Sequence, residues 1–225
     1  MAERVELEAL DLAALLCSRV CHDIISPVGA VINGLEVLDE DNSEEMKSFA
    51  FDLIRRSAKQ ASAKLQFARL AFGAAGSAGA EIDLGDAGKV ATGYMESEKA
   101  TFSFEAPRIL MAKNQVKLLL NLILLGVAAV PRGGSLKVTV EGSKEAPRFM
   151  LRANGPSARV PAAFENLVPG AIAGLAIDAQ QVQAYYAGAL ARACRMKVAA
   201  ALDGPDSVLI SAEPERAVAA ESVAA

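Results

Sequence analysis

The chain contains a single histidine, His22, and the acidic residue Asp23 follows it directly. An imidazole is largely neutral near pH 7, and its unprotonated nitrogen is a nucleophile. A neighbouring carboxylate can accept a hydrogen bond from the other ring nitrogen, although adjacent side chains on a helix diverge by about 100°. A solvated surface histidine beside a solvated acid is the plain alternative. The choice between these interpretations depends on where the surrounding helix directs the imidazole.

Apolar residues recur in steps of three and four through the first forty positions, which predicts one long amphipathic helix over residues 5–39. The stripe consists of Leu10, Ala13, Cys17, Val20, Ile24, Val28, Val31, Leu35 and Leu38. His22 points roughly 160° away from the mean direction of this stripe. Packing of the stripe, with Cys17 in the core, therefore turns His22 toward water.

The other residues on the histidine's face are small or uncharged and leave room for a partner protein: Ser18, Ser26, Gly29 and Asn33. Arg19 lies one turn before His22, where its guanidinium could attract a phosphoryl group or remain a surface cation. Pro27 removes a backbone donor just past the histidine and predicts a kink there.

Composition excludes several classes of function. The net charge is only −4, and no run of Lys and Arg with aromatic residues suggests nucleic acid as a partner. The three cysteines lack metal-ligand spacing and are odd in number, so neither a metal site nor a disulfide framework is expected. The most apolar run, 118–130, is too short to cross a membrane, and no secretory signal is recognised. These features predict a soluble cytoplasmic protein that uses no membrane partner.

A second helix is expected after a polar turn, capped by Asn42 with Glu45. Its own stripe consists of Met46, Ala50, Ile54, Ala58, Ala61, Leu65, Ala68 and Phe72. Two helices cannot bury both stripes together with Phe49, Leu53 and Phe67. We therefore expect residues 1–75 to form a helical hairpin that pairs with a second copy as a homodimeric four-helix bundle.

A stretch of small residues, 73–80, predicts a linker. The segment 80–213 alternates helical and strand patterns and predicts an α/β sandwich, so that the fold class of the whole chain is α+β. Strands are expected near 82 and over 101–105, 136–140, 149–151, 198–202 and 208–211, with helices over 86–96, 114–130 and 180–195. The helix over 114–130 is apolar on nearly every side and is expected to be buried. Residues 214–225 show no periodicity and predict a flexible tail.

The run from His22 to Pro27, His-Asp-Ile-x-x-Pro, resembles the phosphoacceptor box of histidine kinases. The wider runs CSRVCHDIISPVGAVINGLEVL and SAKLQFARLAFGAAGSAG resemble the ChpT-type histidine phosphotransferases of alphaproteobacteria, and the likeness extends over most of the chain. This resemblance implies a phosphorelay in which His22 carries the phosphoryl group as phosphohistidine. Asp23 would tune or orient the imidazole of His22. Ser18, Arg19, Ser26, Gly29 and Asn33 then form the partner surface.

The segment 80–213 resembles the ATP-binding domain of histidine kinases, but two matching positions have lost ligand groups. Leu125 stands where the kinase Asn-Leu-x-x-Asn-Ala pattern has the asparagine that binds Mg²⁺, and a hydrocarbon cannot bind magnesium. Ala153 stands where the kinase Asp-x-Gly-x-Gly motif has its adenine-binding aspartate, in the run 153–157. The glycine-rich lid is reduced to 170–177. We therefore expect a degenerate domain that binds no cofactor.

The implied activity is transfer of a phosphoryl group from the receiver domain of a hybrid histidine kinase to response regulators, by resemblance CtrA and CpdR of the cell cycle. Mg²⁺ is expected on the partner receiver, and no ATP-dependent kinase activity is expected. Two alternatives stay open from the residues alone: a non-catalytic docking or inhibitory module for receivers, and a divergent ATP-dependent histidine kinase.

Overall fold

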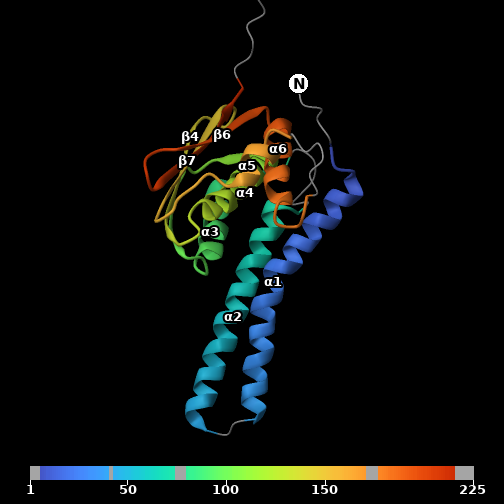
Figure 1. Ribbon diagram of the computed structural model, residues 1–225, viewed down its shortest axis with the longest axis vertical. Helices are drawn as coiled ribbons and strands as arrows, with labels where there is room; N and C mark the ends of the chain where they lie inside the picture. The colour runs from blue at the N-terminus through green and yellow to red at the C-terminus, as the bar shows by residue number, and fades with distance from the viewer. Residues whose placement is uncertain (1–5, 41–42, 74–79, 171–176, 216–225) are drawn as a thin grey trace, which may run out of the picture.

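The computed structural model describes residues 6–40, 43–73, 80–170 and 177–215. Helices α1 (Ala9–Glu40) and α2 (Glu44–Ala71) form the two antiparallel arms of a hairpin that projects from an α/β domain (Figure 1). Ser43 caps α2 by accepting a hydrogen bond from the Met46 amide at 3.3 Å. The cap predicted at Asn42 is wrong, because the Ser43 hydroxyl is placed to accept from the third amide of the helix.

Helix α1 continues through Pro27, which is buried, and changes direction part-way along its length (Figure 1). The two arms approach closely at Gly34, where an added Cβ would lie 2.6 Å from Cγ1 of Ile54. The small buried residues of α2, Ala50, Ser57 and Ala61, allow the same close contact. The predicted hairpin is therefore confirmed, and glycine, serine and alanine set the spacing of its arms.

The predicted stripe of α1 divides between two faces. Pro27 and Gly34 pack against α2, with Val20, Ile24, Val31 and Leu38 half-buried beside them. Leu10, Val28 and Leu35 are 85%, 43% and 49% exposed in the single chain, and Cys17 is exposed as well. The expectation that Cys17 lies in the core is wrong, because one helix partner covers only part of a stripe this wide.

By length and composition, α1 is the one helix among the described residues that could cross a membrane. This is weak evidence, because the core helix of a soluble protein and a signal sequence near the N-terminus pass the same test. The apolar residues of α1 also share the helix with a face of serine, histidine and asparagine.

The α/β domain is built on a five-stranded sheet in the order β2-β4-β5-β7-β6. Its strands are β2 (Ala100–Glu105), β4 (Gly134–Gly142), β5 (Pro147–Asn154), β6 (Met196–Leu202) and β7 (Ser207–Pro214). The edge strand β2 is parallel to β4, and the remaining pairs are antiparallel. A separate pair joins β1 (Glu81–Asp83) to β3 (Leu110–Ala112).

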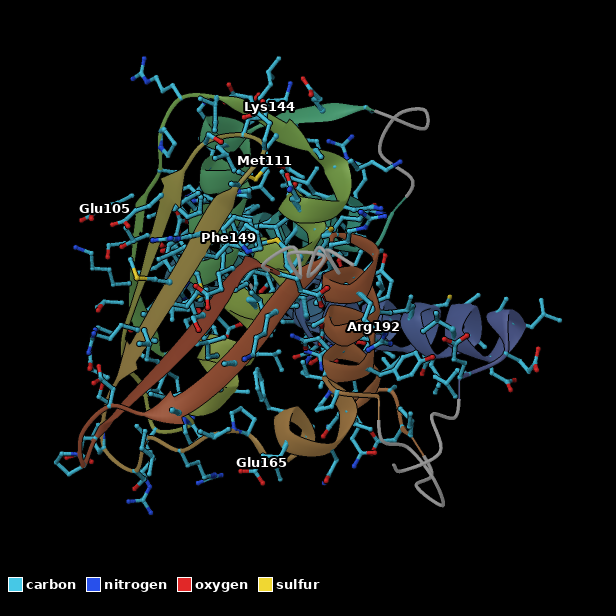
Figure 2. All side chains as sticks on the ribbon, turned by 90° about the horizontal axis from the view of Figure 1, so that it is seen from above. Glu105, Met111, Lys144, Phe149, Glu165 and Arg192 are labelled. Carbon is cyan, nitrogen blue, oxygen red and sulfur yellow. The ribbon has the colours of Figure 1, made fainter. Side chains whose placement is uncertain are left out.

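Helices α3 (Leu84–Met95), α4 (Lys113–Ala129) and α6 (Val182–Ala193) cover one face of this sheet, and α5 (Ala162–Leu167) is a short helix between β5 and α6. Helix α4 is buried on nearly every side, as predicted. Figure 2 shows Phe149 of β5 between the sheet and the helices, while Glu105 at the end of β2 projects outward. The helical hairpin and α/β sandwich of the predicted fold class are both present.

Three contacts fix the hairpin to the α/β domain. The backbone amide of Leu7, just before α1, donates to the Tyr185 hydroxyl of α6 at 3.0 Å. The side-chain amide of Asn121 in α4 donates to the backbone carbonyl of Ala71, at the end of α2, at 3.2 Å. Phe67 of α2 is buried against the ring of Tyr94 in α3, with centroids 4.4 Å apart. The start of α1 and the end of α2 are thus both anchored to the α/β domain.

Candidate functional site

His22 lies near the middle of α1, on the side that faces neither α2 nor the core, and its side chain is 66% exposed. The imidazole is therefore presented to solvent, as the direction of the predicted stripe requires. Exposure of this kind leaves the ring accessible to a second protein.

Asp23 lies between His22 and Arg19. One carboxylate oxygen, Oδ1, is 3.5 Å from Nδ1 of His22, and the other, Oδ2, accepts a hydrogen bond from Nε of Arg19 at 3.0 Å. Because Nδ1 faces the acid, Nε2 is the ring nitrogen turned away from it. The arrangement is that of a nucleophilic nitrogen whose ring is oriented from the opposite side.

Four further predicted residues lie on the same side of α1 as His22: Ser18, Ser26, Gly29 and Asn33. Ser18, Ser26 and Asn33 are exposed, and an added Cβ at Gly29 would meet no atom within 4 Å. This part of the helix surface therefore carries small and polar side chains around His22, together with Ile25, which is 72% exposed.

Arg19 and Asp23 differ from these residues, because they are covered. Their side chains are only 18% and 21% exposed, and they line a cavity of about 580 Å³ between α1 and the α/β domain. The same cavity is lined by Lys64 of α2, Tyr94 of α3, Glu98 in the turn that follows, and Arg159 before α5. These four residues were not predicted for the site.

No signal in the sequence joined these four residues to His22, because they are between 42 and 137 positions away along the chain and meet it only through the docking of the two domains. Glu98 and Lys64 form a loose ion pair, with Nζ 4.0 Å from Oε1. Nζ of Lys64 also lies 5.8 Å from the centroid of the Tyr94 ring. The cavity lining thus includes three cations and two carboxylates beside apolar residues.

The positions that the sequence compares with the kinase motifs are buried or hydrogen-bonded within the fold. Leu125 is buried and contributes hydrocarbon to the cavity lining. The amide nitrogen of Asn121 is engaged by the carbonyls of Ala71 and Lys117, at 3.2 and 2.8 Å. Ala153 is fully buried in β5, in the core of the sheet. Most of the reduced lid, 171–176, lies outside the described residues.

A protein-family model of the histidine phosphotransferase C-terminal domain matches residues 84–206, which is more than half of the chain. The chain belongs to the histidine phosphotransferase family. Protein phosphotransferase ChpT of Brucella abortus (strain 2308) is 54% identical over 95% of this chain and 100% of its own length. A solved structure of a bacterial phosphotransferase is 51% identical, with a TM-score of 0.85, and the match covers 93% of this chain and 99% of that one.

In this histidine phosphotransferase, the family model begins at α3 and therefore covers the α/β domain rather than the hairpin that carries His22. The similarity to the Brucella protein extends across both parts. The similarity therefore includes the hairpin that carries His22 as well as the α/β domain.

Proposed function

We propose that this histidine phosphotransferase relays a phosphoryl group between aspartates of receiver domains, with His22 as the transient carrier. The lone pair of Nε2 attacks the phosphorus of an aspartyl phosphate, and the N–P bond forms as the P–O bond to the aspartate breaks. The aspartate leaves as a carboxylate with its electron pair. Attack by a second receiver's aspartate on phospho-His22 reverses these steps and regenerates the imidazole.

The observation that carries this proposal is an exposed imidazole whose Nδ1 faces Asp23 at 3.5 Å, on a helix face where an added Cβ at Gly29 would meet no atom within 4 Å. Asp23 stabilises the positive charge that develops on the ring as Nε2 binds phosphorus. A receiver docks along Ser18, Ser26, Gly29 and Asn33, with Arg19 as the nearest cation. Mg²⁺ is held by the acidic pocket of the receiver.

This proposal includes no ATP-dependent kinase activity. Leu125 presents hydrocarbon where the kinase pattern has a magnesium ligand, and the adenine-binding acid is replaced by the buried Ala153. By resemblance, the donor is the receiver of a hybrid histidine kinase and the acceptors are response regulators such as CtrA and CpdR, in the cytoplasm. The exposed apolar residues of the hairpin support a homodimer.

The test is a reconstituted relay in which a phosphorylated receiver is mixed with the full chain. We expect phosphate to appear on this protein in an acid-labile, base-stable form, as a phosphoramidate requires, and to be absent from His22→Ala. A Ser103→Ala variant, altered at an exposed position on the outer face of the sheet, is the matched control and should behave as the wild type.

Two other outcomes would replace this proposal. Autophosphorylation with ATP and Mg²⁺ alone would identify a divergent kinase. Equal inhibition or activation of a receiver by wild type and His22→Ala, with no phosphate on either, would identify a non-catalytic docking module.

A further inference from the structure

Strand β6 is an edge of the five-stranded sheet, and among the strands that the structure describes only β7 pairs with it. The Glu215 amide donates to the Arg195 carbonyl at 2.9 Å, and the Asp203 amide donates to the Ser207 carbonyl at 2.8 Å. Hydrogen-bonded residues alternate along an antiparallel strand, so the odd-numbered residues of this segment bond with β7. The even-numbered residues of β6 therefore direct their backbone N–H and C=O groups away from the sheet.

A groove of about 560 Å³ lies along this free edge, between β6 and the helices α5 and α6. Figure 2 labels Glu165 of α5 and Arg192 of α6, which both border the groove. Buried apolar residues form much of its lining, among them Phe164, Val168 and Met196. An apolar side chain placed in the groove would therefore contact hydrocarbon from the helices and from the strand.

The free edge lacks the features that usually keep an edge strand from pairing. Natural edges are protected by charged side chains, prolines or bulges. Lys197 is the single charged residue of β6, and the strand ends in three alanines and Leu202, which is 62% exposed. These small side chains leave the backbone groups accessible. An extended segment is the kind of partner that satisfies such groups one after another.

The charges beside the groove favour a partner that carries carboxylates. Arg192 is half-buried, donates from Nη1 to the Val168 carbonyl at 3.2 Å, and forms no ion pair with the residues that the structure describes. Lys197 lies on the outer face of the sheet, where its cross-strand neighbour is Glu213 on the side of β7. The side of Lys197 that faces the free edge has no such neighbour. Glu165 is the one acid in the lining of the groove.

We propose that the free edge of β6 is a docking site for an extended segment of a partner protein, in which carboxylate side chains alternate with small apolar ones. The segment adds a strand to the sheet, and its backbone bonds with the free groups of Val198 and Ala200. Its apolar side chains enter the groove, because alternate residues of a strand point to the same face. Its carboxylates then lie on the outer face, beside Lys197.

The test uses a short synthetic peptide of alternating glutamate and valine with blocked ends, titrated into the ¹⁵N-labelled full chain. We expect the amide signals of Val198 and Ala200 to shift, because their free N–H groups gain acceptors. The same peptide with lysine in place of glutamate should bind about two- to fivefold more weakly, as expected for an exposed ion pair. Lys197→Glu should invert this preference.

Two substitutions at one position separate strand addition from general stickiness. Ala200→Pro removes a free N–H and leaves the bonds with β7 in place, because proline is tolerated on an edge strand where the N–H faces solvent. It should weaken binding of the glutamate peptide about tenfold. Ala200→Ser keeps the N–H, serves as the matched control and should bind as the wild type does. Urea denaturation shows whether both variants are folded.

Unshifted Val198 and Ala200 amides, equal binding by Ala200→Pro and Ala200→Ser, or a wild type that prefers the lysine peptide would overturn the proposal. Should Ala200→Pro fail to fold, the inversion of preference by Lys197→Glu still decides. These measurements involve neither phosphate nor His22, so their failure would leave the proposed function unaffected.

Discussion

Ser157, in the turn after β5, has a φ of 63°, in the left-handed region. By the resemblance to kinases, this position matches the second glycine of the Asp-x-Gly-x-Gly motif. A positive φ of this size is the conformation that glycine adopts most readily. A residue with a Cβ pays about 1 kcal/mol for this region. We expect Ser157→Gly to raise the free energy of unfolding by up to about 1 kcal/mol, measured by urea denaturation.

The control for this prediction is Ser103→Gly in the exposed part of β2, where the backbone is extended. Glycine in a strand interior costs about 0.5–1 kcal/mol, so this variant should be less stable than the wild type. If both variants lose stability to the same degree, the φ of Ser157 carries no strain and the explanation fails.

His22 and its small neighbours could be predicted from the sequence because they share one helix, whose geometry is fixed by its period. Lys64, Tyr94 and Glu98 could not, because no local pattern links a lysine of α2 and two residues around α3 to a histidine of α1. Their proximity depends on how the α/β domain docks on the hairpin, through contacts such as Phe67 on Tyr94. The burial of Asp23 therefore depends on tertiary packing, which local sequence patterns do not report.

At the scale of the element, α1 contains two glycines in opposite surroundings. An added Cβ at Gly29 would meet nothing within 4 Å, whereas one at Gly34 would lie 2.6 Å from Ile54 Cγ1 and 3.3 Å from the Ala50 carbonyl oxygen. Alanine is preferred to glycine in a helix by about 0.8–1 kcal/mol. Gly29→Ala should therefore stabilise the protein by about that amount.

Gly34→Ala gains the same helix propensity but must push the arms of the hairpin apart, and overpacking of this kind costs about 1–3 kcal/mol. We expect it to be less stable than Gly29→Ala by about that amount. Thermal unfolding of the two variants, followed by circular dichroism, gives the comparison. Equal stabilities would mean that α1 and α2 are not in close contact at Gly34.

The long elements and the short strand β1 were predicted, whereas two other short elements were not. Periodicity identified both helices of the hairpin and the buried α4, because the apolar pattern repeats over many turns of a long helix. Strand β3 and helix α5 have 3 and 6 residues and were not predicted. Their positions depend on partners, since β3 exists by pairing with β1. The cap at Ser43 was missed because Asn42 and Ser43 are both good capping residues.

At the scale of the whole molecule, the hairpin leaves more apolar surface exposed than one chain can cover. Val28, Ile32 and Leu35 of α1 are 43–51% exposed, and Phe51 and Leu65 of α2 are 56% and 50% exposed. Val28 and Leu35 are seven residues apart, and Phe51 and Leu65 are fourteen apart, so each pair lies on one side of its helix. His22 lies roughly 120° round α1 from Val28 and stays clear of this side.

We propose that a second copy of the hairpin covers this surface, because burial of such side chains is worth about 1.5–3 kcal/mol each and a two-fold arrangement buries them twice. We expect the wild type to be a dimer at micromolar concentration by light scattering. Val28→Glu with Leu35→Glu should give a folded monomer, because each protomer would place two carboxylates in the apolar seam. Met150→Glu, which makes the same change at a 36% exposed residue of the sheet, should remain a dimer. A wild-type monomer, or a dimer that survives the double substitution, would show that this face of the hairpin does not form a dimer interface.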